Sequence, residues 1–210
     1  MEQLALLAFD QGTPTESVIF ADRMLSNAEQ AVGLDSPALT VILAHLGRFN
    51  LAVGRNDVAE NTLARINRLI GEDPQEQAPG FLDVLQLKAQ LSAEHGDVAG
   101  AESQFLRAIS VATKYGGVQA IAVGSNCFNL AVVYSKAGRF QDAIKSYVRA
   151  LDIFKRASGE HSPIVGYTLV GAAQAYEKAG DVTTSKALYA AAIEILGPAI
   201  AAQRQQPRWL

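Results

Sequence analysis

The sequence has few of the residues that carry chemistry in small proteins. Its 210 residues include one cysteine, one tryptophan and three histidines, and charged residues make up 19% of the total. The lone cysteine, Cys127, excludes an internal disulfide framework and is typical of a reducing compartment. A formal net charge of −3 provides no positive field for a polyanion, so neither nucleic acid nor an anionic membrane is expected as a partner.

Long apolar runs are missing as well. A helix needs ~20 apolar residues to span a bilayer, and every stretch of that length in the sequence contains a glycine or a charged residue. The short apolar run at the N-terminus carries Glu2 in place of a basic leader, so we expect a helix there and not a signal peptide. These absences together predict a cytoplasmic protein.

Motifs for catalysis and for metal binding are scarce. The three histidines, His45, His95 and His161, are far apart in the sequence and belong to no HExxH pattern or Cys/His cluster. The sequence contains no GxxxxGK[ST] loop for phosphates, and Cys127 stands in an apolar column that favours a buried small side chain. We therefore expect no enzyme activity, no metal and no cofactor.

What the sequence contains instead is a repeat marked by glycine. Gly12, Gly54, Gly96, Gly138 and Gly180 recur every 42 residues, and five such periods account for the 210 residues. A fixed period in this range indicates stacked supersecondary units, none of which buries its apolar face alone. Within one period, residues 128–151 have the pattern of two antiparallel helices with a glycine at the corner.

The predicted fold is all-α, a right-handed α-solenoid of five helix-turn-helix repeats in a single domain. The repeats are expected at about 1–35, 36–77, 78–119, 120–161 and 162–198, with a C-terminal extension at 199–210. Serine or threonine followed by proline marks several helix starts, and glycine marks the ends. The helices are expected at about 1–10, 14–31, 37–53, 56–70, 79–95, 98–114, 119–137, 140–157, 163–179 and 182–202. The last helix is expected to continue into the C-terminal extension, to about Gln205, as a polar-faced segment that shields the last repeat.

Columns of small and large residues explain why such helices pack. One small column holds Gly47, Ala89, Ala131 and Ala173, and a second holds Ala59, Ala101 and Ala143. A large column holds Leu63, Phe105, Tyr147 and Tyr189. Because a small residue lets a neighbouring helix approach, large residues opposite small ones interlock at native density.

These columns resemble the tetratricopeptide repeat, in the 42-residue form of kinesin light chains and many bacterial proteins. The likeness rests on Asn129-Leu130-Ala131, Tyr134, Ala137-Gly138-Arg139-Phe140, Ala143, Tyr147 and Ala150-Leu151. It is strongest over 80–197 and weakest over 1–35. Asn50, Ile66, Lys88 and Ser92 depart from the usual residues, which leaves the packing of the second and third repeats open.

The resemblance implies a concave groove that is lined by the first helix of each pair and binds a peptide or a helix of a partner protein. Carried over residue by residue, the groove is expected to include Val41, Ala44, His45, Arg48, Asp83, Gln86, Gln90, Ser125, Phe128, Asn129, Val132, Tyr167, Val170, Gln174 and Lys178. Asn129 stands in a column that often binds a ligand's main chain in this family, although a solvated or locally capping asparagine is an equal alternative. Phe128 offers an apolar anchor point, or instead packs between repeats.

The sequence thus favours a scaffold that binds a protein or peptide partner. No lysine- and arginine-rich clamp for a C-terminal carboxylate is evident, so a partner segment with an apolar anchor is expected in preference to an acidic tail. One alternative is a structural scaffold that assembles with itself as a homo-oligomer, through the repeat ends or Trp209. Another is a regulatory module that senses a peptide.

Overall fold

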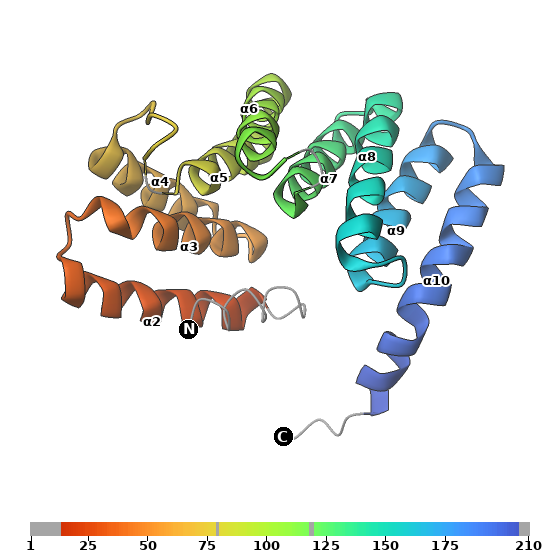
Figure 1. Ribbon diagram of the computed structural model, residues 1–210, viewed down its shortest axis with the longest axis horizontal. Coiled ribbons are helices and arrows are strands. Elements are labelled where there is room, and N and C mark those ends of the chain that lie inside the picture. The colour runs from red at the N-terminus through yellow and green to blue at the C-terminus, as the bar shows by residue number, and fades with distance from the viewer. Residues whose placement is uncertain (1–13, 79, 118–119, 206–210) are drawn as a thin grey trace. The chain divides into compact units, whose positions relative to one another are not determined.

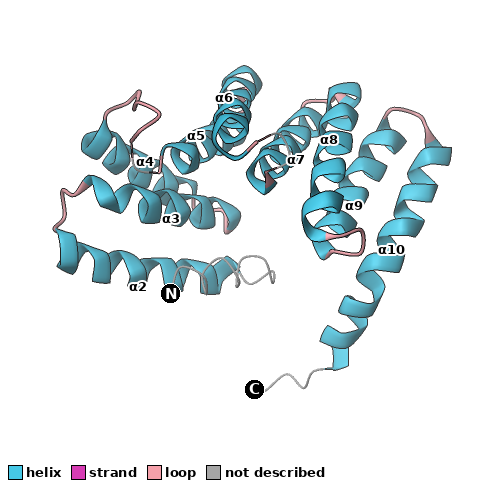
Figure 2. Cartoon of the chain, viewed as in Figure 1, coloured by secondary structure: helices cyan, strands magenta, loops and turns pink. Residues whose placement is uncertain are grey.

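The computed structural model describes residues 14–78, 80–117 and 120–205, and all regular structure in these ranges is helical (Figures 1 and 2). The chain divides into two compact units, Met1–Arg107 and Ala108–Leu210. The division falls inside helix α6, which spans Val98–Gly116. Each unit is built from consecutive helices that pack on their neighbours.

The first unit contains four α-helices before α6 among its described residues. They are α2 (Pro14–Val32), α3 (Thr40–Ala52), α4 (Asn56–Ile70) and α5 (Phe81–Glu94), with a 3-10 turn, η1 (Pro37–Leu39), before α3. Helix α3 packs on α2, α4 and α5, and α4 also contacts α5. A helix that contacts its hairpin partner and the next pair is the arrangement of stacked helical repeats.

The second unit repeats this arrangement. Its helices after α6 are α7 (Ile121–Lys136), α8 (Phe140–Ser158), α9 (Pro163–Lys178) and α10 (Val182–Gln205). Helix α7 packs on α8, α8 on α9, and α9 on α10, while α7 also touches α9 (Figure 1). The predicted class, an all-α solenoid of helical repeats, is therefore confirmed by the helix content and packing within each unit.

The small columns explain how the helices come together. Ala89, Ala131 and Ala173 of the first column are all buried. Gly47, in the same column, faces Leu87 so closely that an added Cβ would stand 2.8 Å from a methyl group of that leucine. The small residues thus make room for large ones, as the sequence predicted.

Helix boundaries agree with the predicted ones to within a few residues, and the difference at the start of α5 has a local cause. The helix expected from residue 79 begins at Phe81. Gly80 precedes it with φ +66°, and its backbone lies against Val41, where an added Cβ would meet main-chain atoms at 3.1–3.2 Å. Because Gly80 has a left-handed conformation where it contacts α3, it cannot have the right-handed conformation of the first turn of α5.

Two expectations lie outside the described residues. The first helix, expected at 1–10 with Gly12 after it, cannot be compared, and the same holds for Trp209. At the other end, α10 extends to Gln205, where the continuation of the last helix is predicted to end. Pro198 stands within this helix.

We expect Gly138→Val to lower the free energy of unfolding by about 1–3 kcal/mol, because valine is strained at positive φ. Gly138 has φ +75°, and an added Cβ would meet no atom within 4 Å, so the cost comes from the backbone alone. Urea unfolding followed by circular dichroism measures it. Ala137→Val is the control, since Ala137 has φ −80°. An equal loss in both variants would contradict the prediction.

Candidate functional site

The predicted groove residues lie on α3 and α5 in the first unit and on α7 and α9 in the second. We call these two surfaces the α3/α5 face and the α7/α9 face. Each is formed by the first helices of adjacent pairs.

Two of the predicted residues on the α3/α5 face lie inside the helix packing. Ala44 and Gln86 are both buried, so neither offers an exposed side chain. The column pattern identified their side of the helix but did not show that a neighbouring helix covers them. His45, Arg48 and Gln90 remain partly exposed.

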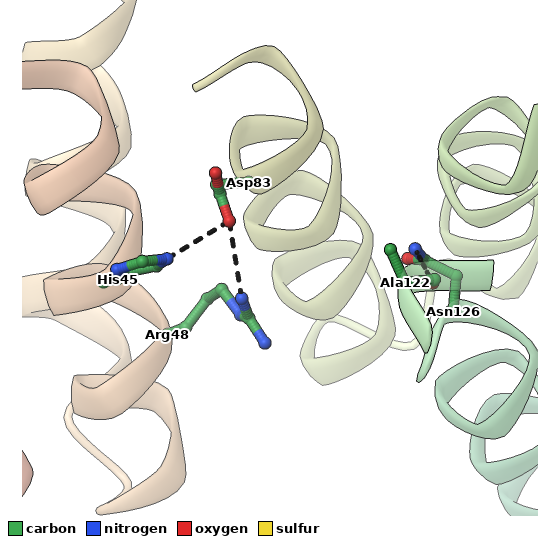
Figure 3. Close-up of polar contacts among 5 residues, drawn as sticks. All are labelled: His45, Arg48, Asp83, Ala122 and Asn126. Atoms are coloured by element: carbon green, nitrogen blue, oxygen red, sulfur yellow. Dashed lines mark hydrogen bonds and ion pairs between the residues drawn. The ribbon is translucent and has the colours of Figure 1, made fainter. Parts of the chain in front are cut away.

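The partly exposed residues include a polar cluster that bridges α3 and α5. His45 Nε2 lies 3.2 Å from Asp83 Oδ1, and Arg48 Nη1 lies 3.9 Å from the same oxygen (Figure 3). His45 and Arg48 are one turn apart on α3, so both point toward one residue of α5. We call these three residues the Asp83 cluster.

The electrostatics of the cluster are unbalanced at Arg48. Its side chain is only 23% exposed. Burial lowers the pKa of its guanidinium, and the charge of Asp83 raises it by less. Arg48 Nε is buried, and no residue in the described ranges provides an acceptor for it. The charged form of this side chain is therefore destabilised by its surroundings.

The α7/α9 face is apolar and aromatic at its floor. Phe128 packs edge-on against Tyr147 of α8, with ring centroids 5.6 Å apart. Tyr147 is buried, and an added Cβ on Gly171 of α9 would stand 2.7 Å from its ring. Phe128 therefore packs on the second helix of its own repeat while it stays partly exposed.

The other predicted residues of the α7/α9 face are partly or fully exposed. Ser125, Asn129, Val132 and Val170 are half-buried, and Tyr167, Gln174 and Lys178 are exposed. Gln174 and Lys178 also border a pocket of about 490 Å³, whose other lining residues are Ser135, Lys136, Phe140, Ala175, Glu177 and Tyr189. At Tyr189 the phenol O–H donates to Glu177 Oε2 at 3.4 Å.

The remaining candidates for chemistry have structural surroundings. His95 pairs with Glu60 at 2.7 Å in an exposed contact, and His161 is exposed after α8. Cys127 is buried, which raises the pKa of its thiol and disfavours the reactive thiolate. Among the described residues, no group of three or more His, Cys, Asp or Glu side chains is placed to hold a metal ion. In those same ranges no helix is both long and apolar enough to cross a membrane.

Among the buried polar residues that sequence analysis did not single out is Asn126 of α7. It is fully buried and its Nδ2 donates to the Ala122 carbonyl at 2.8 Å, while its Oδ1 has no partner among the described residues (Figure 3). Its burial could have been inferred from its column, because the equivalent residues in the neighbouring repeats are Val84 and Thr168, and both are buried. Thr168 satisfies its hydroxyl in the same way, by donating to the carbonyl four residues earlier.

Helix pairs that pack in series, with glycine at the corners and small residues between the helices, define a helical-repeat protein. Residues 121–196 match the family model described as "Tetratricopeptide repeat", so the resemblance to that family is confirmed over this part of the chain. No curated protein matches the sequence.

Solved structures share the fold across nearly the whole chain. The TPR-like repeats of a Podosopora anserina kinesin light chain are 17% identical with a TM-score of 0.64, and the match covers 97% of this chain and 95% of that one. The MamA structure is 16% identical with a TM-score of 0.55, over 94% and 96% of the two chains. Identities this low show a common fold and no more.

We expect Gly171→Ala to destabilise the second unit by about 1–3 kcal/mol, since a methyl group there overpacks the contact with Tyr147. Urea unfolding of a double-mutant cycle with Tyr147→Ala measures the coupling. The cost of the alanine at 171 should largely vanish once the tyrosine ring is removed. Additive losses in the double variant would show that the close contact is not the cause.

Proposed function

We propose that this chain is a non-enzymatic scaffold that binds a segment of a partner protein on its α7/α9 face. The observation that carries the proposal is Tyr167, which is 57% exposed on α9. The half-buried Val170 belongs to the same face. Tyrosine is enriched in protein interfaces because it supplies a large rigid area with a polar end.

The packing of the face supports this proposal. Phe128 rests on the buried Tyr147, so its position is fixed from beneath while part of its ring stays accessible. Asn129, next to it in the sequence, is half-buried and has an amide that pairs with a peptide main chain. A fixed apolar floor with polar groups at its edge is the usual anatomy of a binding surface.

The experiment is affinity capture from a lysate of the source organism, quantified by mass spectrometry. We expect Tyr167→Glu to reduce capture of at least one protein about tenfold or more, because a carboxylate replaces an aromatic side chain that the partner covers. The matched control is Val148→Glu on α8, since Val148 is 49% exposed and lies outside the face. Capture by this variant should equal that of the wild type. Equal capture by all three proteins, with circular dichroism showing each one folded, would contradict the proposal.

A second candidate function, self-assembly, is favoured by Ile193 of α10. Ile193 is 70% exposed, whereas Ile109, two repeats earlier in the same column, is buried, and Leu151 between them is half-buried. A position that is covered elsewhere in the repeat is here open to another helix, which a second copy of the chain provides.

If the chain self-assembles through α10, light scattering should give a mass above that of the 22.3 kDa chain, and Ile193→Glu should restore the monomer mass. The physical reason is the cost of burying a carboxylate in an apolar contact. Val148→Glu again serves as the control for an added surface charge. A monomer at high protein concentration would remove this candidate.

A further inference from the structure

We propose that a cavity between α4, α5 and α6 binds an aromatic ring that carries a hydroxyl group. The cavity has a volume of about 390 Å³, and all of its lining residues lie between Glu60 and Gln104, in the first unit. We call it the α4–α6 cavity. The residues that carry the argument are Leu63, Asn67, Lys88, Leu91, Ser92 and Gln104. The inference goes beyond the proposed scaffold function and does not depend on the α7/α9 face.

The cavity lies where the chain departs from its own repeat, at Ser92 of α5. The equivalent residues in the two later repeats are Tyr134 and Tyr176, and Tyr134 is only 6% exposed. Asn50, at the same position of the preceding repeat, is buried and its Nδ2 donates to the Leu46 carbonyl at 2.9 Å. The third repeat therefore lacks the phenol ring that the later repeats have at this position.

Two amide oxygens at the cavity have no hydrogen-bond donor. Asn67 Oδ1 and Gln104 Oε1 are buried, and neither has a partner among the described residues. A buried acceptor without a donor costs free energy, which a ligand with an O–H group would offset. Packing does not require the amide of Asn67, because its column otherwise holds apolar residues. These are Leu25, Ile109, Leu151 and Ile193.

The cavity also has apolar walls. Leu63 and Leu91 border it, and Leu91 is 4% exposed. Water would supply donors to the two amide oxygens but would not cover the leucine side chains. A hydroxyl-bearing aromatic ring does both, since its body is apolar and its O–H donates. The cavity therefore combines the two features that a phenol requires.

The charged residues of the cavity have partners of their own. Lys88 Nζ donates to the Glu72 carbonyl, in the loop between α4 and α5. Glu60 and His95 pair with each other at 2.7 Å, and both side chains are more than half exposed. Because these contacts occur without a ligand, the cavity does not require an ionic ligand.

The volume admits a ring with a substituent. An apolar cavity of about 150 Å³ is large enough to hold benzene. At about 390 Å³ the α4–α6 cavity has room for a benzene ring, its hydroxyl and a further group. A free phenol and a tyrosine side chain of another protein share this chemistry, and the experiment below distinguishes these two sources.

The test is a nuclear magnetic resonance titration of the full chain, read at the methyl signals of Leu63 and Leu91. The probes are p-cresol, which is a tyrosine side chain alone, and N-acetyltyrosine amide, which adds main-chain groups. Toluene is the control probe, since it has the ring and the methyl group of p-cresol without the hydroxyl. We expect p-cresol to bind saturably, with a dissociation constant on the order of 1 mM. Toluene should bind about fivefold or more weakly, because it makes no hydrogen bond.

The second phenol identifies the source of the ring. Binding of N-acetyltyrosine amide at least as tight as that of p-cresol would indicate a tyrosine side chain, and tighter binding of p-cresol would indicate a free phenol. No saturable response to either phenol, as a cavity that holds only water would give, would overturn the proposal. Equal affinities for p-cresol and toluene would also overturn it.

Variants tie the response to the cavity. Ser92→Tyr supplies the ring that the later repeats contain, so it should abolish the p-cresol response and raise the melting temperature. The matched control is Ser158→Tyr at the exposed end of α8, which should bind p-cresol as the wild type does. Asn67→Leu removes one acceptor, so it should weaken p-cresol binding about threefold or more without weakening toluene binding. This variant tests the site whether or not Ser92→Tyr folds. Wild-type affinity for p-cresol in folded Asn67→Leu or Ser92→Tyr would overturn the proposal.

Discussion

Close approach between helices at small residues is the constraint on which the rest of this structure depends. At Gly47, Gly124 and Gly171 an added Cβ would stand 2.7–2.8 Å from a large side chain of another helix. The partners are Leu87, Phe154 and Tyr147, which are all buried. Since a Leu, Phe or Tyr side chain fills the place of the missing Cβ, the spacing between helices is fixed by pairs of residues and not by the helices themselves. That spacing determines which sides of α3, α5, α7 and α9 stay open.

The fold was predictable because part of this constraint, the column that begins at Gly47, is visible in the sequence. A glycine at every corner and a small residue in each first helix recur at one period, and periodicity needs no knowledge of the partner residue. Ala89, Ala131 and Ala173 are buried as their column requires. The start of α5 was less predictable, because Gly80 takes its left-handed conformation against Val41, a residue 39 positions away in the sequence. Contacts of that kind leave no local pattern.

The candidate site was predictable only as a side of a helix. Column positions identified His45, Arg48 and Tyr167, and the structure places all three at least partly in solvent. The same reasoning included Ala44 and Gln86, which neighbouring helices cover. Whether a residue at the edge of an apolar stripe is covered depends on the size of the side chain opposite, and a single column does not contain that information. The pairing of His45 with Asp83 and the ring contact of Phe128 were beyond sequence reasoning for the same reason.

The stack and the binding surface draw on different positions, and this separation has a chemical consequence. Packing restricts the small columns to glycine and alanine, with a cavity or a clash as the penalty for change. One column holds a cation, an apolar residue and two amides, at Arg48, Val132, Gln90 and Gln174. Side chains this different occur in one column because the packing of the helices does not require a particular size or polarity there. At such a position a buried cation without full pairing costs stability that an apolar or amide side chain would not. The cost of burying part of Arg48 is therefore separate from the packing that holds the stack together.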